Sequence, residues 1–380
     1  MGEVCQYPIV FVHGVFGWGS DEGIDKKIPY WGATTGSLTD YLNGQGYVCY
    51  SASVGPINSA WDRACELYAR LTGTVVDYGK AHAEKANHRR FGRKYDTPLV
   101  SGWGSERKIH LIGHSFGGNT IRLLVHLLTY GDPEEQAATQ DGTLSALFTG
   151  GKEDWVQSIV TICAPHNGTC AIDMMHQYRI MAPAKAVVYN YAGLVGRTPA
   201  QGGVVDFHME QYGLSCTPGK KDSLPLGEAK RQIHSHTDCL EYDLSPKGAA
   251  QWNTYIRMNP KVYYFSYCYN AIDPVKSTKQ RPVSRADTAL LKVTSSAMFR
   301  YGKSIGNTAC CNDGLVNVQS ACCPAGAPHR NFDAGCIEPG IWNVMPMRKG
   351  DHGTPIGLHA DREQTRQMYL EMLQMLHGTE

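Results

Sequence analysis

The chain has 380 residues, 42% hydrophobic and 19% charged, which suits a large buried core and excludes a disordered chain or a coiled coil. Its 36 Lys and Arg nearly balance its 35 Asp and Glu, so we expect no nucleic-acid partner. No apolar run reaches the about 18 residues that a membrane helix needs, so we expect no transmembrane anchor.

The first residues lead almost directly into an apolar strand and carry no signal-peptide pattern. Two interpretations remain open at this point. Either the protein is not secreted, or a leader is absent from this chain.

Five apolar runs predict the strands of a parallel sheet, because continuous apolar runs suit strands that are buried on both faces. They are residues 7–14, 47–56, 108–115, 155–165 and 261–270. Helical patterns separate several of these strands, at 35–46 and 119–128, and an amphipathic helix over 361–378 closes the chain. This alternation predicts an α/β fold with a mostly parallel central sheet and helices on both faces.

Two stretches break the alternation and are predicted to be insertions on the sheet. Residues 55–107 hold a helical piece and a polar excursion that carries His and Arg. Residues 168–237 hold an apolar, Met-bearing helical segment followed by polar loops. Because no linker or internal repeat is evident, we expect a single domain over residues 1–380.

The 13 cysteines are an odd number, so at least one thiol must be free. Five of them crowd one segment near the C-terminal end: Cys310, Cys311, Cys322, Cys323 and Cys336. We favour a disulfide cluster there, with reduced thiols as the alternative. A zinc knuckle fits less well, because the two vicinal pairs lack CxxC spacing.

The strongest motif is Gly113-His114-Ser115-Phe116-Gly117, a GxSxG sequence between a predicted strand and a predicted helix. In this context the sharp turn projects the Ser115 hydroxyl above the sheet, and the helix N-terminus favours developing negative charge. Ser115 is therefore the predicted nucleophile.

A serine nucleophile needs a base and an acid that orients the base. We predict His352 as general base and Asp313 as the orienting acid, in the chain order Ser, acid, His. Asp313 could instead only cap a turn. Asp351 is the alternative acid, although adjacent side chains rarely provide the geometry, and His359 is the alternative base.

The oxyanion hole requires two backbone N–H groups. One is expected from Phe116, which follows the nucleophile, and the other from Val15, in the glycine-bracketed loop after the first strand. The alternative is that this loop is only a tight strand exit.

Asp62, His82, His88 and Asp238 form a candidate metal site, since His and Asp are suitable zinc ligands. Four protein ligands would leave no open position, which would make such a site structural. Spacing alone supports it weakly, because positions i and i+6 do not share a helix face.

The sequence resembles the zinc-containing, thermoalkalophilic-type bacterial true lipases, an α/β-hydrolase family, over most of its length. The segments that carry the resemblance include PIVFVHGVFGWG, WDRACELYARLTGTVVDYGKAHAEKANHRRFGRKY, IHLIGHSFGGNTIRLLV, TDCLEYDLS and NDGLVN. The resemblance implies an α/β-hydrolase fold with a zinc-binding insertion and a helical lid insertion. It also matches Ser115, Asp313 and His352 to the triad and Val15 and Phe116 to the oxyanion pair. Asp62, His82, His88 and Asp238 match the zinc ligands.

The sequence also departs from the family. Gly113 stands where family members carry alanine, and the cysteine-rich segment 310–336 has no counterpart. Thr354 and His359 stand where the family places acidic calcium ligands, so we expect no tightly bound calcium there. Two nearby acids, Asp361 and Glu363, belong instead to the first turn of the last helix.

These features predict a serine ester hydrolase, a lipase that cleaves apolar acyl esters such as triacylglycerols. The Met-bearing helix within 170–200 is the predicted lid, and the substrate is expected at an interface. The resemblance further implies a secreted protein whose leader is absent from this chain. A broad esterase or polyester hydrolase is the alternative, and a non-catalytic binding protein on a hydrolase fold is a third hypothesis. The sequence indicates no oligomeric state.

Overall fold

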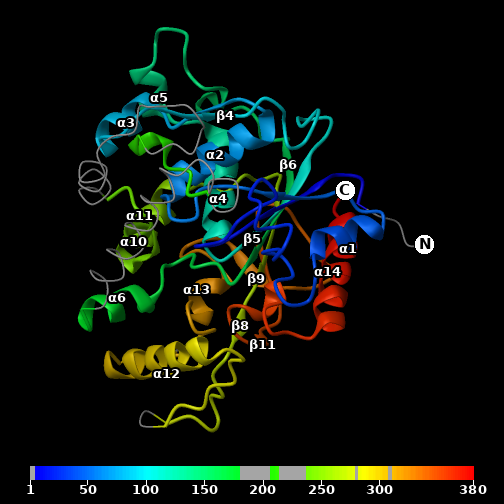
Figure 1. Cartoon of the computed structure of the whole chain (residues 1–380), viewed down its shortest axis with the longest axis vertical. Helices are drawn as coiled ribbons and strands as arrows, with labels where there is room; N and C mark the ends of the chain where they lie inside the picture. The colour runs from blue at the N-terminus through cyan, green and yellow to red at the C-terminus, as the bar shows by residue number, and fades with distance from the viewer. Residues whose placement is uncertain (1–4, 180–205, 214–236, 279–280, 307–309) are drawn as a thin grey trace.

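A seven-stranded sheet forms the centre of the protein in a computed structural model, which describes residues 5–179, 206–213, 237–278, 281–306 and 310–380 (Figure 1). The strand order is β2-β1-β5-β6-β7-β10-β9, and all neighbouring strands are parallel. The bounds are β1 Ile9–Val12, β2 Cys49–Ala52, β5 Ile109–His114, β6 Val156–Ile162, β7 Tyr263–Tyr267, β9 His329–Asn331 and β10 Trp342–Val344.

Every residue of the central strands β1, β5 and β6 is buried, as their continuous apolar runs require. The five predicted strands and the α/β-hydrolase-like fold class are confirmed. Strands β9 and β10 were not predicted, because each has only three residues and neither forms an apolar run. β10 pairs with β7, and β9 pairs with β10, so these two strands depend on tertiary pairing and not on local sequence.

Helices cover both faces of the sheet (Figure 1). Helices α1 (Leu38–Gly44) and α14 (Arg362–His377) pack on one apolar cluster, and α2 (Ala60–Thr72) and α4 (Phe116–Tyr130) pack on the other. The other α-helices of the described residues are α3 Lys80–Ala86, α5 Pro133–Ala138, α6 Cys170–Gln177, α10 Leu240–Leu244, α11 Pro246–Tyr255, α12 Ala289–Ser304 and α13 Val318–Cys322. Short 3-10 turns lie at Ala146–Thr149, Glu210–Tyr212 and Thr354–Ile356.

The first predicted insertion, residues 55–107, lies between β2 and β5. It consists of α2, α3 and a two-stranded antiparallel ladder of β3 (Val75–Asp77) and β4 (Phe91–Lys94). Another small ladder pairs β8 (Tyr269–Asn270) with β11 (Arg348–Lys349). Within the second predicted insertion, residues 168–237, α6 and the turn at Glu210–Tyr212 are described. The predicted lid helix falls largely on residues outside the described ones.

The expected disulfide cluster is not formed, because no disulfide joins two of the twelve cysteines that the structure describes. The crowding in sequence does not persist in space. Cys310 packs with Ile272 and Phe299, while the sulfur of Cys322 lies 3.7 Å from that of Cys268, outside the cysteine-rich segment. The alternative of reduced thiols therefore describes these residues.

None of the helices in the described part of the chain has the length and apolar character that crossing a bilayer requires.

Candidate active site and metal centre

Ser115 sits on a strained turn between the end of β5 and the start of α4, with φ 54° and ψ −128°. The flanking glycines permit this turn. A Cβ on Gly113 would lie 2.6 Å from the backbone of Gly117, and one on Gly117 would lie 2.2 Å from the Val12 carbonyl oxygen. The sequence GxSxG therefore folds into the strand-turn-helix arrangement that exposes a serine hydroxyl.

His352 and Asp313 meet although 39 residues separate them. The imidazole Nδ1 of His352 lies 2.8 Å from Oδ2 of Asp313. The other carboxylate oxygen accepts hydrogen bonds from the backbone N–H groups of Leu315 and Val316, at 2.9 and 2.7 Å. These bonds fix the carboxylate so that it can orient the imidazole and hold its Nδ1 proton.

The alternative acid and base are placed differently. The Asp351 carboxylate accepts hydrogen bonds from the backbone N–H groups of Gly353 and Asp287, both at 2.9 Å, and from Thr354. His359 is exposed to solvent. Asp351 therefore organises the loop that carries His352.

His352 lies beside the turn that carries Ser115. The ring centroids of His352 and His114 are 4.7 Å apart, and His114 is the residue before the serine. The loop after β1 approaches the same point, since a Cβ on Gly14 would lie 2.7 Å from the Cβ of Ser115. The three segments predicted to supply the nucleophile, the base and one oxyanion donor are thus adjacent.

Tyr30 and His114 connect these segments through a buried chain of hydrogen bonds. The Gly14 N–H donates to the Tyr30 hydroxyl at 3.0 Å, which lies 2.7 Å from Nδ1 of His114. Nε2 of His114 lies 2.9 Å from the carbonyl oxygen of His352. Because a carbonyl only accepts, Nε2 carries the proton and Tyr30 donates to Nδ1. Burial holds the pKa of His114 well below its ordinary value, which keeps this ring neutral.

The two predicted oxyanion donors are free to bind a ligand. Within the described residues, neither the Val15 nor the Phe116 N–H donates a hydrogen bond to the protein. Phe116 opens α4, so its N–H has no acceptor within the helix. The adjacent N–H of Phe16 instead donates to the Pro56 carbonyl at 3.0 Å.

The four predicted metal ligands converge on one point, where Asp238 meets Asp62, His82 and His88 of the first predicted insertion. Nε2 of His82 lies 3.4 Å from both Oδ1 of Asp62 and Oδ2 of Asp238, and Nε2 of His88 lies 3.7 and 3.6 Å from the same oxygens. All four atoms are buried and lack a hydrogen-bond partner. Four unpartnered buried ligand atoms facing one another are the arrangement that a bound cation would satisfy.

The distances and the surrounding contacts fit a tetrahedral metal. Zinc bonds of about 2.0–2.1 Å put ligand atoms about 3.3–3.4 Å apart. Nδ1 of His88 donates to the carbonyl of Arg89 at 2.9 Å, which leaves Nε2 unprotonated for a metal. Gln211 donates to Oδ2 of Asp62 at 2.9 Å, which orients that carboxylate.

A left-handed residue explains how two histidines six positions apart can meet. Asn87 ends α3 with φ 53° and turns the chain back, so that the rings of His82 and His88 lie 5.3 Å apart. Helical periodicity alone does not predict this turn.

Comparisons with known proteins identify the family. The sequence model of the family described as "Lipase-like, C-terminal domain" matches residues 5–379. The chain belongs to this lipase family. The crystal structure of Staphylococcus hyicus lipase matches with a TM-score of 0.83 and 32% identity, covering 100% of this chain and 97% of that chain. EstA from Clostridium botulinum matches with a TM-score of 0.80 and 34% identity, covering 98% and 88%.

Curated relatives of this lipase-family chain are longer than the chain itself. It is 35% identical to the lipase of Staphylococcus hyicus and 33% identical to lipase 2 of Staphylococcus aureus, over 98% and 93% of its own length. It spans 56% and 50% of these relatives, which is about half of their length.

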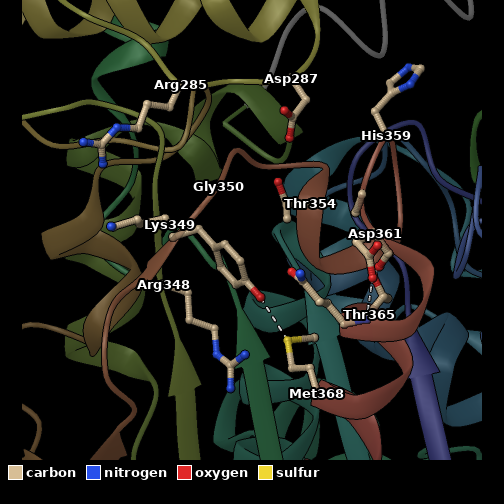
Figure 2. Close-up of a pocket in the computed structure, with 13 residues that line it drawn as sticks. Arg285, Asp287, Arg348, Lys349, Gly350, Thr354, His359, Asp361, Thr365 and Met368 are labelled. Carbon is tan, nitrogen blue, oxygen red and sulfur yellow. Dashed lines mark hydrogen bonds between the residues drawn. The ribbon is translucent and has the colours of Figure 1, made fainter.

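A pocket of about 570 Å³ lies at Thr354 and His359, the two positions where the family carries acidic calcium ligands and this chain does not (Figure 2). Its walls carry Thr354 and His359, together with the cationic side chains of Arg285, Arg348 and Lys349. Two acids, Asp287 and Asp361, also line it, and Oδ1 of Asp361 accepts a hydrogen bond from the first turn of α14. Three cations against two carboxylates do not fit a hard divalent cation, which requires an excess of anionic oxygen ligands.

Proposed function

We propose that this lipase-family chain hydrolyses carboxylic esters of apolar acids, with triacylglycerols as the main substrate class. The observation that carries the proposal is the strained Ser115 beside a buried His352 whose Nδ1 lies 2.8 Å from Asp313. Catalytic serines have this arrangement because the hydroxyl needs an oriented base to become a nucleophile.

In the proposed mechanism, Oγ of Ser115 attacks the ester carbonyl while Nε2 of His352 takes the hydroxyl proton. Asp313 holds the Nδ1 proton and stabilises the imidazolium that forms. The N–H groups of Val15 and Phe116 bind the oxyanion of the tetrahedral intermediate. His352 then protonates the departing alcohol, and a water that it activates releases the acid from the acyl-enzyme.

We further propose that the chain is of the zinc-containing subtype, with Asp62, His82, His88 and Asp238 as ligands. The bound ion would supply a cross-link between distant segments, and a full set of protein ligands leaves no position for a reactive water. We propose no calcium at the pocket around Thr354, because its cationic walls oppose a divalent ion.

The wider organisation is also a proposal. We propose one hydrolase domain over residues 1–380 with insertions at 55–107 and 168–237, the second of which contributes the lid. We also propose that the enzyme is secreted, because emulsified esters are encountered outside the cell. Immunodetection in culture medium and in washed cells of the producing organism tests this placement.

Hydrolysis of a graded ester series tests the activity. Purified protein should cleave soluble p-nitrophenyl butyrate and emulsified tributyrin and triolein. Ser115→Ala should lower each rate by about 10³-fold or more with the fold intact by circular dichroism. Ser101→Ala, which alters an exposed serine, is the matched control and should act as wild type. Equal rates for the two variants would contradict the proposal, and no turnover of any ester by wild type would favour a non-catalytic binding protein.

A further inference from the structure

Residues 274–305, which we call the basic-apolar segment, differ in charge from the rest of the chain. The segment contains seven cations and one acid, a net charge of +6, while the whole chain has +1, so the remaining residues sum to −5. The seven cations are Lys276, Lys279, Arg281, Arg285, Lys292, Arg300 and Lys303. Charge concentrated in this way creates a local field for an anionic partner, although the whole chain is nearly neutral.

The same segment exposes large apolar side chains. Val275 is 92% exposed, Leu290 is 70% exposed and Val293 is 68% exposed. Leu290 and Val293 lie one helical turn apart on α12, so they share one face of that helix. Leu291 and Phe299 hold the opposite face in the protein. Helix α12 therefore exposes an apolar stripe of Leu290 and Val293 to solvent. Its buried face anchors it to the rest of the protein.

Most of the described cations of the segment are available to a partner. Arg285 forms an ion pair with Asp273 at 2.5 Å. Among the described residues, no acid forms an ion pair with Arg281, Lys292 or Arg300. Cations that no protein carboxylate neutralises can bind anionic groups without breaking an existing pair.

The segment also lies next to the candidate active site. The side chain of Asn312 donates to the carbonyl of Ser295 in α12 at 3.2 Å, and a Cβ on Gly314 would lie 3.1 Å from Leu291. Asp313 stands between these two contacts. Figure 1 shows α12 at one end of the long axis of the molecule, and α12 contacts α6.

We propose that the basic-apolar segment docks the enzyme on an anionic lipid–water interface. Leu290 and Val293 enter the outer apolar layer, while Lys292 and Arg300 contact the anionic headgroups. Apolar side chains flanked by cations are the combination that binds such an interface, where burial and electrostatic attraction add. The inference rests on the proposed function, because docking here would hold the side of the molecule that carries Asp313 against the substrate phase.

Vesicle sedimentation tests the docking directly. Wild type should bind vesicles of phosphatidylcholine with about 30% phosphatidylglycerol at least tenfold more tightly than pure phosphatidylcholine, and added salt should weaken this binding. Lys292→Glu/Arg300→Glu should lower anionic binding about tenfold or more. Lys80→Glu/Lys247→Glu makes the same change in charge at exposed positions outside the segment and should bind as wild type.

A second variant, in which the exposed apolar side chains are replaced by serine, tests the apolar contribution separately. Leu290→Ser/Val293→Ser should lower binding at high salt, where the electrostatic share is screened, and circular dichroism checks its fold. Hydrolysis of soluble p-nitrophenyl butyrate should be unchanged in both segment variants, so loss of docking is distinguishable from failure of the proposed catalysis. Undiminished anionic binding by the charge-reversed variant would overturn the inference. So would concentration-dependent self-association that only the Leu290→Ser/Val293→Ser variant abolishes, since a second copy would then cover the stripe.

Discussion

At the scale of single residues, Tyr30 is the group whose importance the hydrogen bonds show and the sequence does not. Its hydroxyl accepts from Gly14 and donates to His114, which in turn binds the backbone of His352. The hydroxyl therefore connects the oxyanion loop, the nucleophile turn and the base. Tyr30 touches no reacting atom in the proposed mechanism, so its role is to position other groups.

Tyr30→Phe keeps the ring and removes only this connection. We expect kcat for soluble p-nitrophenyl butyrate to fall about 10- to 100-fold with KM nearly unchanged, because donor and base geometry matter most in the transition state. Tyr130→Phe is the matched control, since its hydroxyl also donates a hydrogen bond, to the carbonyl of Met258 at 2.8 Å, in another part of the fold. Equal kcat values for the two variants would show that the connection has no part in catalysis.

Ser115, Asp313 and His352 could be predicted from the sequence, because the GxSxG motif and the chain order Ser, acid, His point to them. Tyr30 has no such signal. Its partners lie 16 and 84 residues away, and only the parallel pairing of β1 with β5 brings them together. The convergence of His82 and His88 likewise depends on the left-handed Asn87, which spacing rules do not anticipate.

At the scale of elements, Glu66 on α2 is a buried carboxyl that ties the helix to its surroundings. It accepts hydrogen bonds from Gly55 at 2.5 Å, Asn58 at 2.7 Å and the Tyr78 hydroxyl at 3.0 Å. Burial raises the pKa of Glu66 to about 7 from an ordinary value of 4.5. Between about pH 4.5 and pH 7, Glu66 therefore keeps its proton in the folded protein and loses it in the unfolded chain.

The sign of the pH dependence follows from that difference. Between about pH 4.5 and pH 7 the folded state binds more protons, so the stability that Glu66 contributes is lost as the pH rises. Glu66→Gln removes this titration. Urea unfolding at pH 5 and pH 7 should show a smaller loss of unfolding free energy in the variant, while Glu363→Gln, at an exposed position, should keep the wild-type loss. Identical losses in all three proteins would refute the prediction.

The loop after β11 should hold its shape without calcium. Asp351 receives four hydrogen bonds there, and Arg285 and Lys349 line the adjacent pocket (Figure 2). Melting temperatures measured with millimolar calcium and with a calcium-selective chelator should therefore agree within about one degree. A saturable rise of several degrees with calcium would contradict this account.

Elements were predictable where the pattern is long and regular, as in the apolar runs of β5 and β6 and the amphipathic repeat of α14. Helix α12 was not predicted, because Lys292 and the hydroxyl side chains of Thr294, Ser295 and Ser296 interrupt its apolar face. Its stability comes from packing of Leu291, Met298 and Phe299 against the protein, which is a tertiary effect.

At the scale of the whole molecule, the metal centre is expected to join segments that are far apart in the chain. Asp62 and Asp238 are 176 residues apart, with strands β5 and β6 between them in sequence, so a bound ion makes local folding depend on metal binding. Elemental analysis should find about one zinc per chain, from the single four-ligand set. Chelation of the metal should lower the melting temperature by several degrees.

His82→Ala should lower zinc content and melting temperature together, while hydrolysis of soluble ester persists at low temperature because the triad is separate from the site. His329→Ala, at an exposed histidine, is the control and should retain both. Wild-type protein that is purified without zinc, and whose melting temperature is changed neither by added zinc nor by His82→Ala, would show that the four residues have no metal-binding role.

The most direct test of the central claim is covalent labelling of the nucleophile with a fluorophosphonate ester, read by peptide mass spectrometry. An activated serine reacts with such a reagent and an ordinary surface serine does not. The account predicts one adduct per chain, on the peptide that contains Ser115, with labelling slowed about 10³-fold or more in His352→Ala. An adduct on another residue, or no adduct on folded wild-type protein, would contradict it.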